Sequence, residues 1–380
     1  MSELSYLEKL LDGVEVEWRN LGDTSLFEIA NNGRKPVKAS LRIAGETPYY
    51  GANNIQDYVD GYTHDGEYVL IAEDGSASLE NYSIQYATGK FWANNHVHVV
   101  RGKERVHSRF LYHYLCIVNF LPFLTGGGRA KLTKGQLIEI PVPIPCPDNP
   151  EKSLAIQSEI VRILDKFTAL TAELTAELTA RKKQYNYYRD QLLSFKEGEV
   201  EWKTLGEVAT FRRGTAITQK QTTPGDIPVV ANGPTPTYFH SESNRQDETI
   251  VIARSGAYAG YVSFWNQPIF LTDAFSVHPN LKIVKPKFLY YVLQNKQEHI
   301  HAMKKGAGVP HVRVKEFESY DVPIPPLAEQ VRIVTILDKF DTLTNSITEG
   351  LPREIELRQK QYEYYRDMLF SFPKPDVVEA

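Results

Sequence analysis

One uninterrupted stretch, residues 151–197, limits how this chain can fold. It contains no Gly or Pro from Glu151 to Glu197, so it is far longer than a typical helix of a globular protein. Its apolar residues recur at alternating intervals of four and three, the spacing of a helix that buries one narrow seam against a partner helix. The expected seam consists of Ile156, Ile160, Ile163, Phe167, Leu170, Leu174 and Leu178.

The middle of this stretch repeats itself. The segment TAELTAELTA (171–180) contains one tetrapeptide twice and begins a third copy. Four residues turn a helix by about 400°, so each copy adds roughly 6 Å of length and only about 40° of rotation. The segment is therefore expected to act as a spacer.

The partner seam is expected in the same chain, because the chain is one unit written twice with a period of about 180 residues. Its residues are Ile333, Ile336, Phe340, Leu343 and Ile347. The matching segments are ILDKF at 163–167 and 336–340, KKQYNYYRDQLLSF at 182–195 and QKQYEYYRDMLFSF at 359–372, EVEW at 15–18 and 199–202, and VPIP at 142–145 and 322–325.

This repeat predicts an α+β protein with two α/β domains joined by two long helices, which form an antiparallel coiled coil with pseudo-two-fold symmetry. A short N-terminal helix is expected to complete the repeat beside the C-terminal YYRDMLFSF (364–372). The second long helix contains Gly-Leu-Pro at 350–352, which predicts a break there. The expected boundaries are 1–14, 15–147, 148–198, 199–325 and 326–380.

Within the first domain, alternation and turn residues predict strands in 66–75 and 96–100 and a helix over 108–121. The proline-rich segment 141–150 is expected to be a stiff extended connector. The long helix has three candidate capping residues, Asp148, Asn149 and Ser153. The second domain repeats five segments of the first with different residues. Segments 46–54, 66–78, 91–100, 109–119 and 126–137 correspond, in this order, to GDIPVVANG (225–233), ETIVIARSGAYAG (248–260), FLTDAFSVHP (270–279), KFLYYVLQN (287–295) and GAGVPHVRVKEF (306–317).

Charge is distributed unevenly along the chain. The net charge of the whole chain is −4. Residues 19–147 carry 13 basic and 12 acidic side chains, and residues 203–325 carry 14 basic and 10 acidic ones. The helices and termini therefore carry the remaining 16 basic and 25 acidic side chains. Globular parts that can approach phosphate on an acidic helical scaffold are consistent with this distribution. The two cysteines, Cys116 and Cys146, fit a reducing cytoplasm, and no apolar run suggests a membrane span or a signal peptide.

The motifs of several enzyme classes are missing. The sequence lacks a P-loop and an Asn/Asp-Pro-Pro-aromatic loop, and its GGG (126–128) and GAG (306–308) segments do not have dinucleotide-binding spacing. PDNPEKS (147–153) is a weak nuclease match. His96 and His98 in HVHVV suggest a metal pair, although a surface or core pair is the commoner arrangement. We therefore expect a non-catalytic chain without a metal or cofactor of its own.

Taken together, the duplicated ILDKF helix, the QYxYYRD segments, the Pro-x-Pro connectors and the TAEL repeat resemble the specificity subunits of type I restriction-modification enzymes, and the TAEL repeat resembles their IC subgroup. The resemblance covers essentially the full length. It implies two target recognition domains that each read half of a bipartite, asymmetric site in double-stranded DNA, with the helical spacer fixing the gap. It also implies two modification subunits and restriction subunits as partners, with S-adenosylmethionine, ATP and Mg in those partners.

Base edges are read by forked or bidentate donors and acceptors on loops, and phosphates by cations. In the first domain the candidates are Tyr49, Tyr50, Asn53, Asn54, Trp92, Asn94, Asn95 and His96, with Arg129, Lys131 and Lys134 for phosphate. In the second domain they are Asn232, Tyr238, Arg254, Ser255, Tyr258, Thr272 and Asp273, with Arg212, Arg213, His311 and Arg313 as basic companions. The alternatives for these residues are core packing for the aromatic rings and, for the cations, a solvated face or a local ion pair.

Two further alternatives remain open. The tyrosines of the two helices, Tyr185, Tyr187, Tyr188, Tyr362, Tyr364 and Tyr365, either stack on bases or, as we favour, pack against helices and partner subunits. The whole chain could instead be a two-domain coiled-coil scaffold that binds proteins and not DNA. Salt-sensitive, sequence-specific affinity for duplex DNA would separate the two functions.

Overall fold

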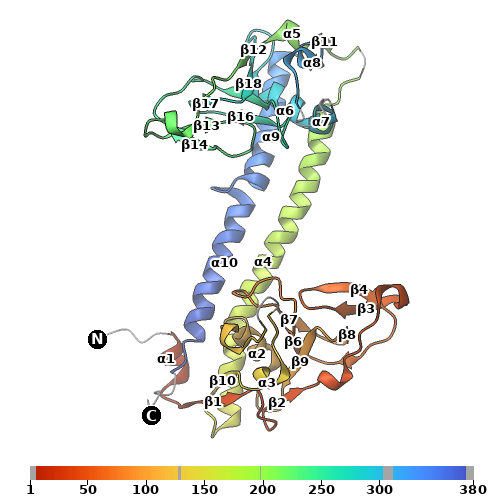
Figure 1. Cartoon of the computed structure of the whole chain (residues 1–380), viewed down its shortest axis with the longest axis vertical. Coiled ribbons are helices and arrows are strands. Elements are labelled where there is room, and N and C mark those ends of the chain that lie inside the picture. The colour runs from red at the N-terminus through yellow and green to blue at the C-terminus, as the bar shows by residue number, and fades with distance from the viewer. Residues whose placement is uncertain (1–5, 127–129, 197, 303–310, 374–380) are drawn as a thin grey trace. The chain divides into compact units, whose positions relative to one another are not determined.

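The computed structural model describes residues 6–126, 130–196, 198–302 and 311–373. The chain divides into two compact units. Unit 1 comprises residues 1–173 and 355–380, and unit 2 comprises residues 174–354 (Figure 1). The first boundary between the units, which lies between residues 173 and 174, falls inside the TAEL segment. In the described part of the chain, no helix is both long enough and apolar enough to cross a membrane.

Unit 1 contains a four-stranded antiparallel sheet in the order β2-β9-β6-β7, a four-stranded sheet in the order β4-β3-β8-β5 whose β3 and β8 are parallel, and a β1-β10 pair. Its elements are α1 (Tyr6–Leu11), β1 (Val16–Asn20), β2 (Phe27–Ile29), β3 (Ala44–Tyr50), β4 (Ile55–Val59), β5 (His64–Asp65), β6 (Tyr68–Ala72), β7 (Ile84–Ala87), β8 (Lys90–Ala93), β9 (Val97–Gly102), α2 (Ser108–Leu115), α3 (Lys134–Leu137) and β10 (Pro141–Pro145).

Unit 2 has the same plan, with sheets β12-β18-β15-β16 and β14-β13-β17 and a β11-β19 pair, and β13 and β17 are again parallel. Its elements are β11 (Glu201–Thr204), α5 (Leu205–Val208), β12 (Ala209–Arg213), β13 (Ile227–Val230), β14 (Tyr238–His240), β15 (Thr249–Ala253), β16 (Val262–Trp265), β17 (Phe270–Leu271), β18 (Ala274–Pro279), α6 (Pro286–Asn295), α7 (Gln297–Ala302), α8 (Val314–Glu318), β19 (Asp321–Ile324) and α9 (Leu327–Asn345). The internal repeat read from the sequence is therefore a repeat of topology.

The central strand of each unit shows why the sequence folds this way. Every residue of β6, Tyr-Val-Leu-Ile-Ala, is buried. Because side chains alternate between the faces of a strand, Val69 and Ile71 enter the main core of unit 1, while Tyr68 and Leu70 enter a second core on the other face. In β15, Ile250 and Val251 divide between two cores in the same way.

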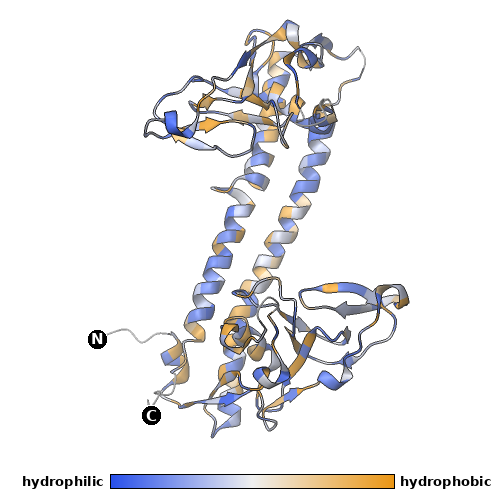
Figure 2. Ribbon diagram, viewed as in Figure 1, coloured by the Kyte–Doolittle hydropathy of each residue, from blue (hydrophilic) through white to orange (hydrophobic). Residues whose placement is uncertain are grey.

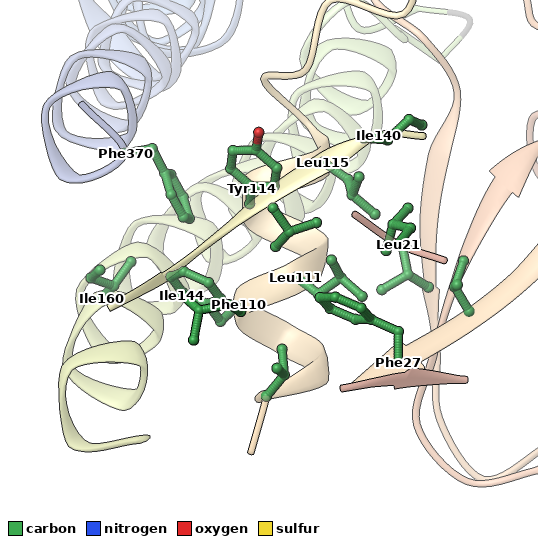
Figure 3. Packing of buried hydrophobic residues seen from close by; sticks show 14 of the residues in the cluster. Leu21, Phe27, Phe110, Leu111, Tyr114, Leu115, Ile140, Ile144, Ile160 and Phe370 are labelled. Carbon is green, nitrogen blue, oxygen red and sulfur yellow. The ribbon is translucent and has the colours of Figure 1, made fainter. Parts of the chain in front are cut away.

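Helix α2 covers the main core of unit 1. Figure 3 shows its Phe110 and Tyr114 among Ile144 of β10, Ile160 of α4 (Pro150–Leu192) and Phe370, which directly follows α10 (Gly350–Leu369). The helix predicted over 108–121 is shorter than expected. It ends at Leu115, and Phe120 turns back into the core, where its ring stacks on Tyr82 with centroids 4.6 Å apart.

The proline-rich connector is extended, as predicted, and it also forms strand β10. Pro141, Pro143 and Pro145 alternate with buried Val142 and Ile144, and the strand pairs with β1 in a two-stranded ladder. Proline, which lacks an N–H donor, is tolerated at such an edge. Of the three capping candidates for α4, Asn149 is the cap, because its Oδ1 accepts the N–H of Lys152 at 3.0 Å. Ser153 lies inside α4 and bonds Gln157 instead.

The long helices are amphipathic, and in Figure 2 their turns carry both hydrophilic and hydrophobic residues. Within unit 1 the first part of α4 runs antiparallel to the end of α10, with Phe167 stacked on Tyr365 at a centroid distance of 5.2 Å. Within unit 2 the end of α4 packs on α9, with Tyr188 stacked on Phe340 at 5.8 Å. Of the six tyrosines predicted to pack against helices and partner subunits, Tyr185 and Tyr362 are buried or half-buried in these contacts. The other four, Tyr187, Tyr188, Tyr364 and Tyr365, are exposed.

The seam prediction needs one correction. Ile156, Ile160 and Ile333 are at most 3% exposed and belong to the cores of the units, and Leu170, Leu174 and Leu178 are half-buried. Ile347 is not a seam residue, since α9 ends at Asn345 and the Ile347 side chain is 80% exposed. The non-helical residues 346–349 form the break that Gly350 and Pro352 predicted.

A paired set of polar contacts fastens each domain to its helix. In unit 1, Asp165 of α4 accepts hydrogen bonds from Arg109 at 2.9 Å and contacts His113 Nε2 at 2.8 Å. In unit 2 the corresponding Asp338 accepts from Tyr291 at 2.5 Å and pairs with Lys287 at 3.0 Å. Gln157 and Gln330 likewise accept the N–H of His107 and Lys285, each at 2.8 Å. These contacts hold the sheets at a fixed place on the helix.

Candidate nucleic-acid interface

In each unit, loops that are distant in sequence meet at the ends of the central strands. In unit 1 the residues after β6 meet the β8–β9 connection and residues 130–132, and the N–H of Leu132 donates to Glu73 O at 2.8 Å. In unit 2 the N–H of Val312 donates to Arg254 O at 2.9 Å. We call residues 73–74, 94–96 and 130–132 the first loop cluster. Residues 232, 254–255, 272–273 and 311–312 form the second loop cluster.

The backbone pairing makes these two clusters equivalent. Asp74 bridges Lys131 in unit 1, and Ser255 bridges His311 in unit 2. It follows that Glu73 corresponds to Arg254 and Asp74 to Ser255. The backbone arrangement is therefore the same in both clusters, but the side chains differ. The acidic pair Glu73 and Asp74 of unit 1 is replaced in unit 2 by a cation, Arg254, and a hydroxyl, Ser255.

The first loop cluster is organised around Glu73. Its carboxylate accepts from Arg34 at 2.6 Å and pairs with Lys131 at 3.0 Å. Burial alone would raise the pKa of Glu73, but the hydrogen bonds from Arg34 and Lys131 outweigh it and hold the pKa below its ordinary value. Beside it, His96 Nδ1 lies 2.5 Å from Asp74 Oδ1, and the His96 side chain stays 45% exposed. An imidazole and a carboxylate thus face solvent together.

The second loop cluster is a network around Asp273. Asp273 accepts from Asn232 at 2.5 Å and from Ser255 at 2.8 Å, and it pairs with Arg254 at 2.7 Å. Burial raises the pKa of the Asp273 carboxyl, but the hydrogen bonds from Asn232 and Ser255 and the charge of Arg254 bring it below its ordinary value. Asn232 Oδ1 also accepts the N–H of Arg254 at 3.1 Å.

Two arginines open onto a cleft at this network. The cleft has a volume of about 340 Å³ and is lined by Arg213, Gly214, Ala216, Arg254, Thr272, Asp273 and Ala274. The sequence thus identified Arg213, Thr272 and Asp273 separately, and the fold brings them together. Forked guanidinium donors at the rim of a cleft are the groups that read guanine edges or hold phosphates.

Some predicted contact residues have structural roles instead. The Tyr49 ring is 1% exposed, and its Oη accepts the N–H of Val37 at 3.0 Å, so it is excluded from direct base contact. Asn94 is 4% exposed and uses its Oδ1 to accept the N–H of His96 at 2.8 Å. Tyr238 donates to Ile217 O at 2.7 Å. Each of these three side chains, predicted to contact DNA, forms a hydrogen bond that holds a loop.

Other candidates occupy the surface around the clusters. Asn53 ties the β3–β4 hairpin to Gly75 O at 2.9 Å, Trp92 donates to Lys35 O at 2.7 Å, and Tyr50 packs half-buried on Phe91. Exposed side chains comprise Asn54, Asn95, Lys131, Lys134, Arg212, Arg213, Arg254, Tyr258, His311 and Arg313. Arg129 lies outside the described residues.

The two histidines of HVHVV have different partners. His98 is 1% exposed, with Nδ1 at 2.9 Å from Asn31 Nδ2 and Nε2 at 2.7 Å from Leu132 O, while His96 pairs with Asp74. His98 is therefore a core residue that supports the first loop cluster. Across the described residues, no group of three or more His, Cys, Asp or Glu is arranged to hold a metal ion.

The candidates drawn from the sequence missed two sets of residues. Arg245 of unit 2 donates to Ser276 Oγ at 2.8 Å and to Arg213 O at 3.0 Å, so it fixes the end of β12 beneath the cleft. In unit 1 the segment 33–45 carries Arg34, Lys35, Lys38 and Arg42 and no acidic residue. That run of cations is the sequence signal by which the segment could have been identified.

Comparisons with known proteins agree with this architecture. The family model described as "Type I restriction modification DNA specificity domain" matches residues 14–181 and again 197–357. A putative type I restriction enzyme specificity subunit of Haemophilus influenzae is 49% identical over 97% of this chain and 98% of its own length. The EcoR124I/EcoR124II specificity subunit of Escherichia coli is 41% identical over 100% of both chains.

Among solved structures, the S subunit of a type I restriction-modification system from M. genitalium has the same fold, with a TM-score of 0.68 at 18% identity over 96% of this chain and 98% of that one. A second structure, from work on complex assembly of the type I R-M system, reaches a TM-score of 0.54 at 14% identity, covering 94% and 98%. By its two copies of the specificity domain and its full-length relatives, this chain belongs to the family of type I restriction-modification DNA specificity subunits.

Proposed function

We propose that this chain selects the DNA site at which partner modification and restriction subunits of a type I system act. Each unit reads one half of a bipartite, asymmetric site in double-stranded DNA. The first domain (residues 15–147) and the second (residues 199–325) act as the two target recognition domains. The chain itself is non-catalytic, and S-adenosylmethionine, ATP and Mg belong to the partner subunits.

One observation carries this proposal. The two loop clusters share a backbone frame but present different hydrogen-bonding groups, with Glu73 and Asp74 in the first and Arg254 and Ser255 in the second. Each base pair presents its own pattern of donors and acceptors in the major groove. A common frame with exchanged donors and acceptors suits two modules that read different bases.

The exposed cations around each cluster suit the phosphate backbone, which supplies most of the sequence-independent affinity. Lys131 and Lys134 would serve the first unit, and Arg212, Arg213 and Arg313 the second, since all five side chains are exposed. The long helix α4 would set the gap between the half-sites, because its length grows by roughly 6 Å for each added TAEL.

Genome-wide methylation mapping tests the proposal. A matching modification subunit is expressed in cells with and without this chain, and modified positions are read by sequencing. We expect a split motif with a fixed, unspecified gap that appears only with the chain present. A modification pattern that is the same in both cells, together with no sequence-specific DNA binding by the purified complex, would support the scaffold alternative.

A further inference from the structure

The most unusual surface outside the loop clusters is the segment that joins β2 to β3 in unit 1. Residues 33–45 contain four cations and no acidic residue, and they expose two large apolar side chains, Leu41 at 69% and Ile43 at 71%. The corresponding segment of unit 2, residues 213–225, has two cations, Arg213 and Lys220, no acidic residue and no exposed large apolar side chain. The exposed apolar pair therefore belongs to unit 1 alone.

The segment is held rigidly in this position. The Arg42 guanidinium lies 4.1 Å from the centroid of the Tyr49 ring and donates to Val37 O at 3.1 Å and to Asp57 at 3.3 Å. The Ile43 carbonyl accepts the N–H of Asp60 at 2.8 Å. Because the backbone is fixed from both sides, exposing Leu41 and Ile43 does not require the loop to rearrange.

The surroundings of the two apolar side chains indicate what they contact. They border an open cleft of about 260 Å³ whose lining also includes two cations, Lys35 and Arg42, one acidic residue, Asp60, and Trp92. Lys35 and Lys38 are exposed, so the apolar pair is flanked by cations. An apolar protein partner would not require this flanking charge, whereas DNA offers phosphates beside apolar base faces.

We propose that segment 33–45 is an apolar wedge that enters the minor groove beside the half-site read by unit 1. Leu41 and Ile43 press between neighbouring base pairs, and Lys35 and Lys38 contact the flanking phosphates. Proteins that insert such side chains kink the duplex and gain surface contact in return. This role rests on the proposed DNA-binding function and adds a bend to the direct readout by the loop cluster.

The test uses the full chain in complex with its modification subunits and a duplex that carries the mapped site. The variant combines Leu41→Ser with Ile43→Ser. We expect DNA affinity to fall about ten-fold and the bend, measured by energy transfer between dyes at the duplex ends, to decrease. The control is Leu79→Ser, another exposed leucine of unit 1 at 43% exposure, which should bind and bend DNA like the parent.

A second variant tests the cations. Lys35→Ala with Lys38→Ala should weaken binding to all sequences and reduce the slope of log affinity against log salt by about 2, roughly one for each lost phosphate contact. If the Leu41/Ile43 variant keeps both its affinity and its bend, the wedge is wrong while the proposed function stands. If that variant no longer assembles with the modification subunits, the segment is a protein contact and the wedge is again wrong. If even the parent complex shows no site-specific binding, the proposed function itself fails.

Discussion

At the scale of single residues, the buried histidine that joins domain to helix in unit 1 makes stability depend on pH. His113 is 0% exposed, contacts Asp165 at 2.8 Å and lies 3.2 Å from Tyr362 Oη. Burial lowers the pKa of His113 to about 4 from an ordinary 6.5. Between these two values the unfolded chain binds a proton that the folded chain does not, so stability falls as the pH falls.

For the intact chain this contribution amounts to about 2 kcal/mol of lost stability between pH 7.5 and pH 5. The variant His113→Gln loses the contacts of His113 with Asp165 and Tyr362, so it should be less stable than the parent at pH 7.5. Because Gln does not titrate, the variant does not lose further stability from this site at low pH, and the difference narrows at pH 5. Chemical denaturation of the parent and the variant at pH 7.5 and pH 5 measures the difference between their free energies of unfolding. An unchanged difference would show that His113 does not titrate in this window.

At the scale of elements, the start of α4 depends on one side chain. Asn149 Oδ1 accepts the N–H of Lys152, an amide that the helix itself cannot satisfy. Asn149→Ala should lower stability by about 1 kcal/mol, the usual cost of losing an N-cap. Asp148→Ala is the matched control and should have little effect. Thermal unfolding of the two variants compares them, and equal melting temperatures would contradict the capping assignment.

The length of α4 gives a second prediction at this scale. Inserting one further TAEL after Leu178 adds about 6 Å and about 40° of rotation to the helix. We expect both half-sites to stay unchanged and the unspecified gap between them to lengthen, as read by methylation mapping. A changed half-site, or full activity at the original gap, would contradict the spacer role.

At the scale of the whole molecule, the two units should behave as independent readers. His96 and Arg254 have side chains of similar exposure, 45% and 46%, in equivalent loop clusters. His96→Ala should relax only the half-site of unit 1, and Arg254→Ala only that of unit 2, each by about ten-fold or more in discrimination. The double variant should show both changes together, because distant sites act additively. Methylation motifs that change in both halves after a single substitution would contradict this independence.

Much of this architecture was determined by the sequence alone. The repeat of ILDKF and of the Tyr-rich segment predicted two similar units, and the short apolar run within residues 66–75 predicted a strand. These features depend on the local spacing of apolar residues, which a sequence records directly. The break near Gly350 was visible for the same reason, since glycine and proline have strong conformational preferences of their own.

The tertiary structure decided which predicted residues meet. Asn232, the neighbouring pair Arg254 and Ser255, and Asp273 come from three separate segments of the sequence, and only the fold brings them into one network. It also decided that Tyr49 is enclosed while Leu41 and Ile43 are exposed, although composition suggests no such difference. The physical reason is that exposure and hydrogen-bond partners depend on contacts between distant segments, whereas helix and strand periods depend on neighbours in the chain.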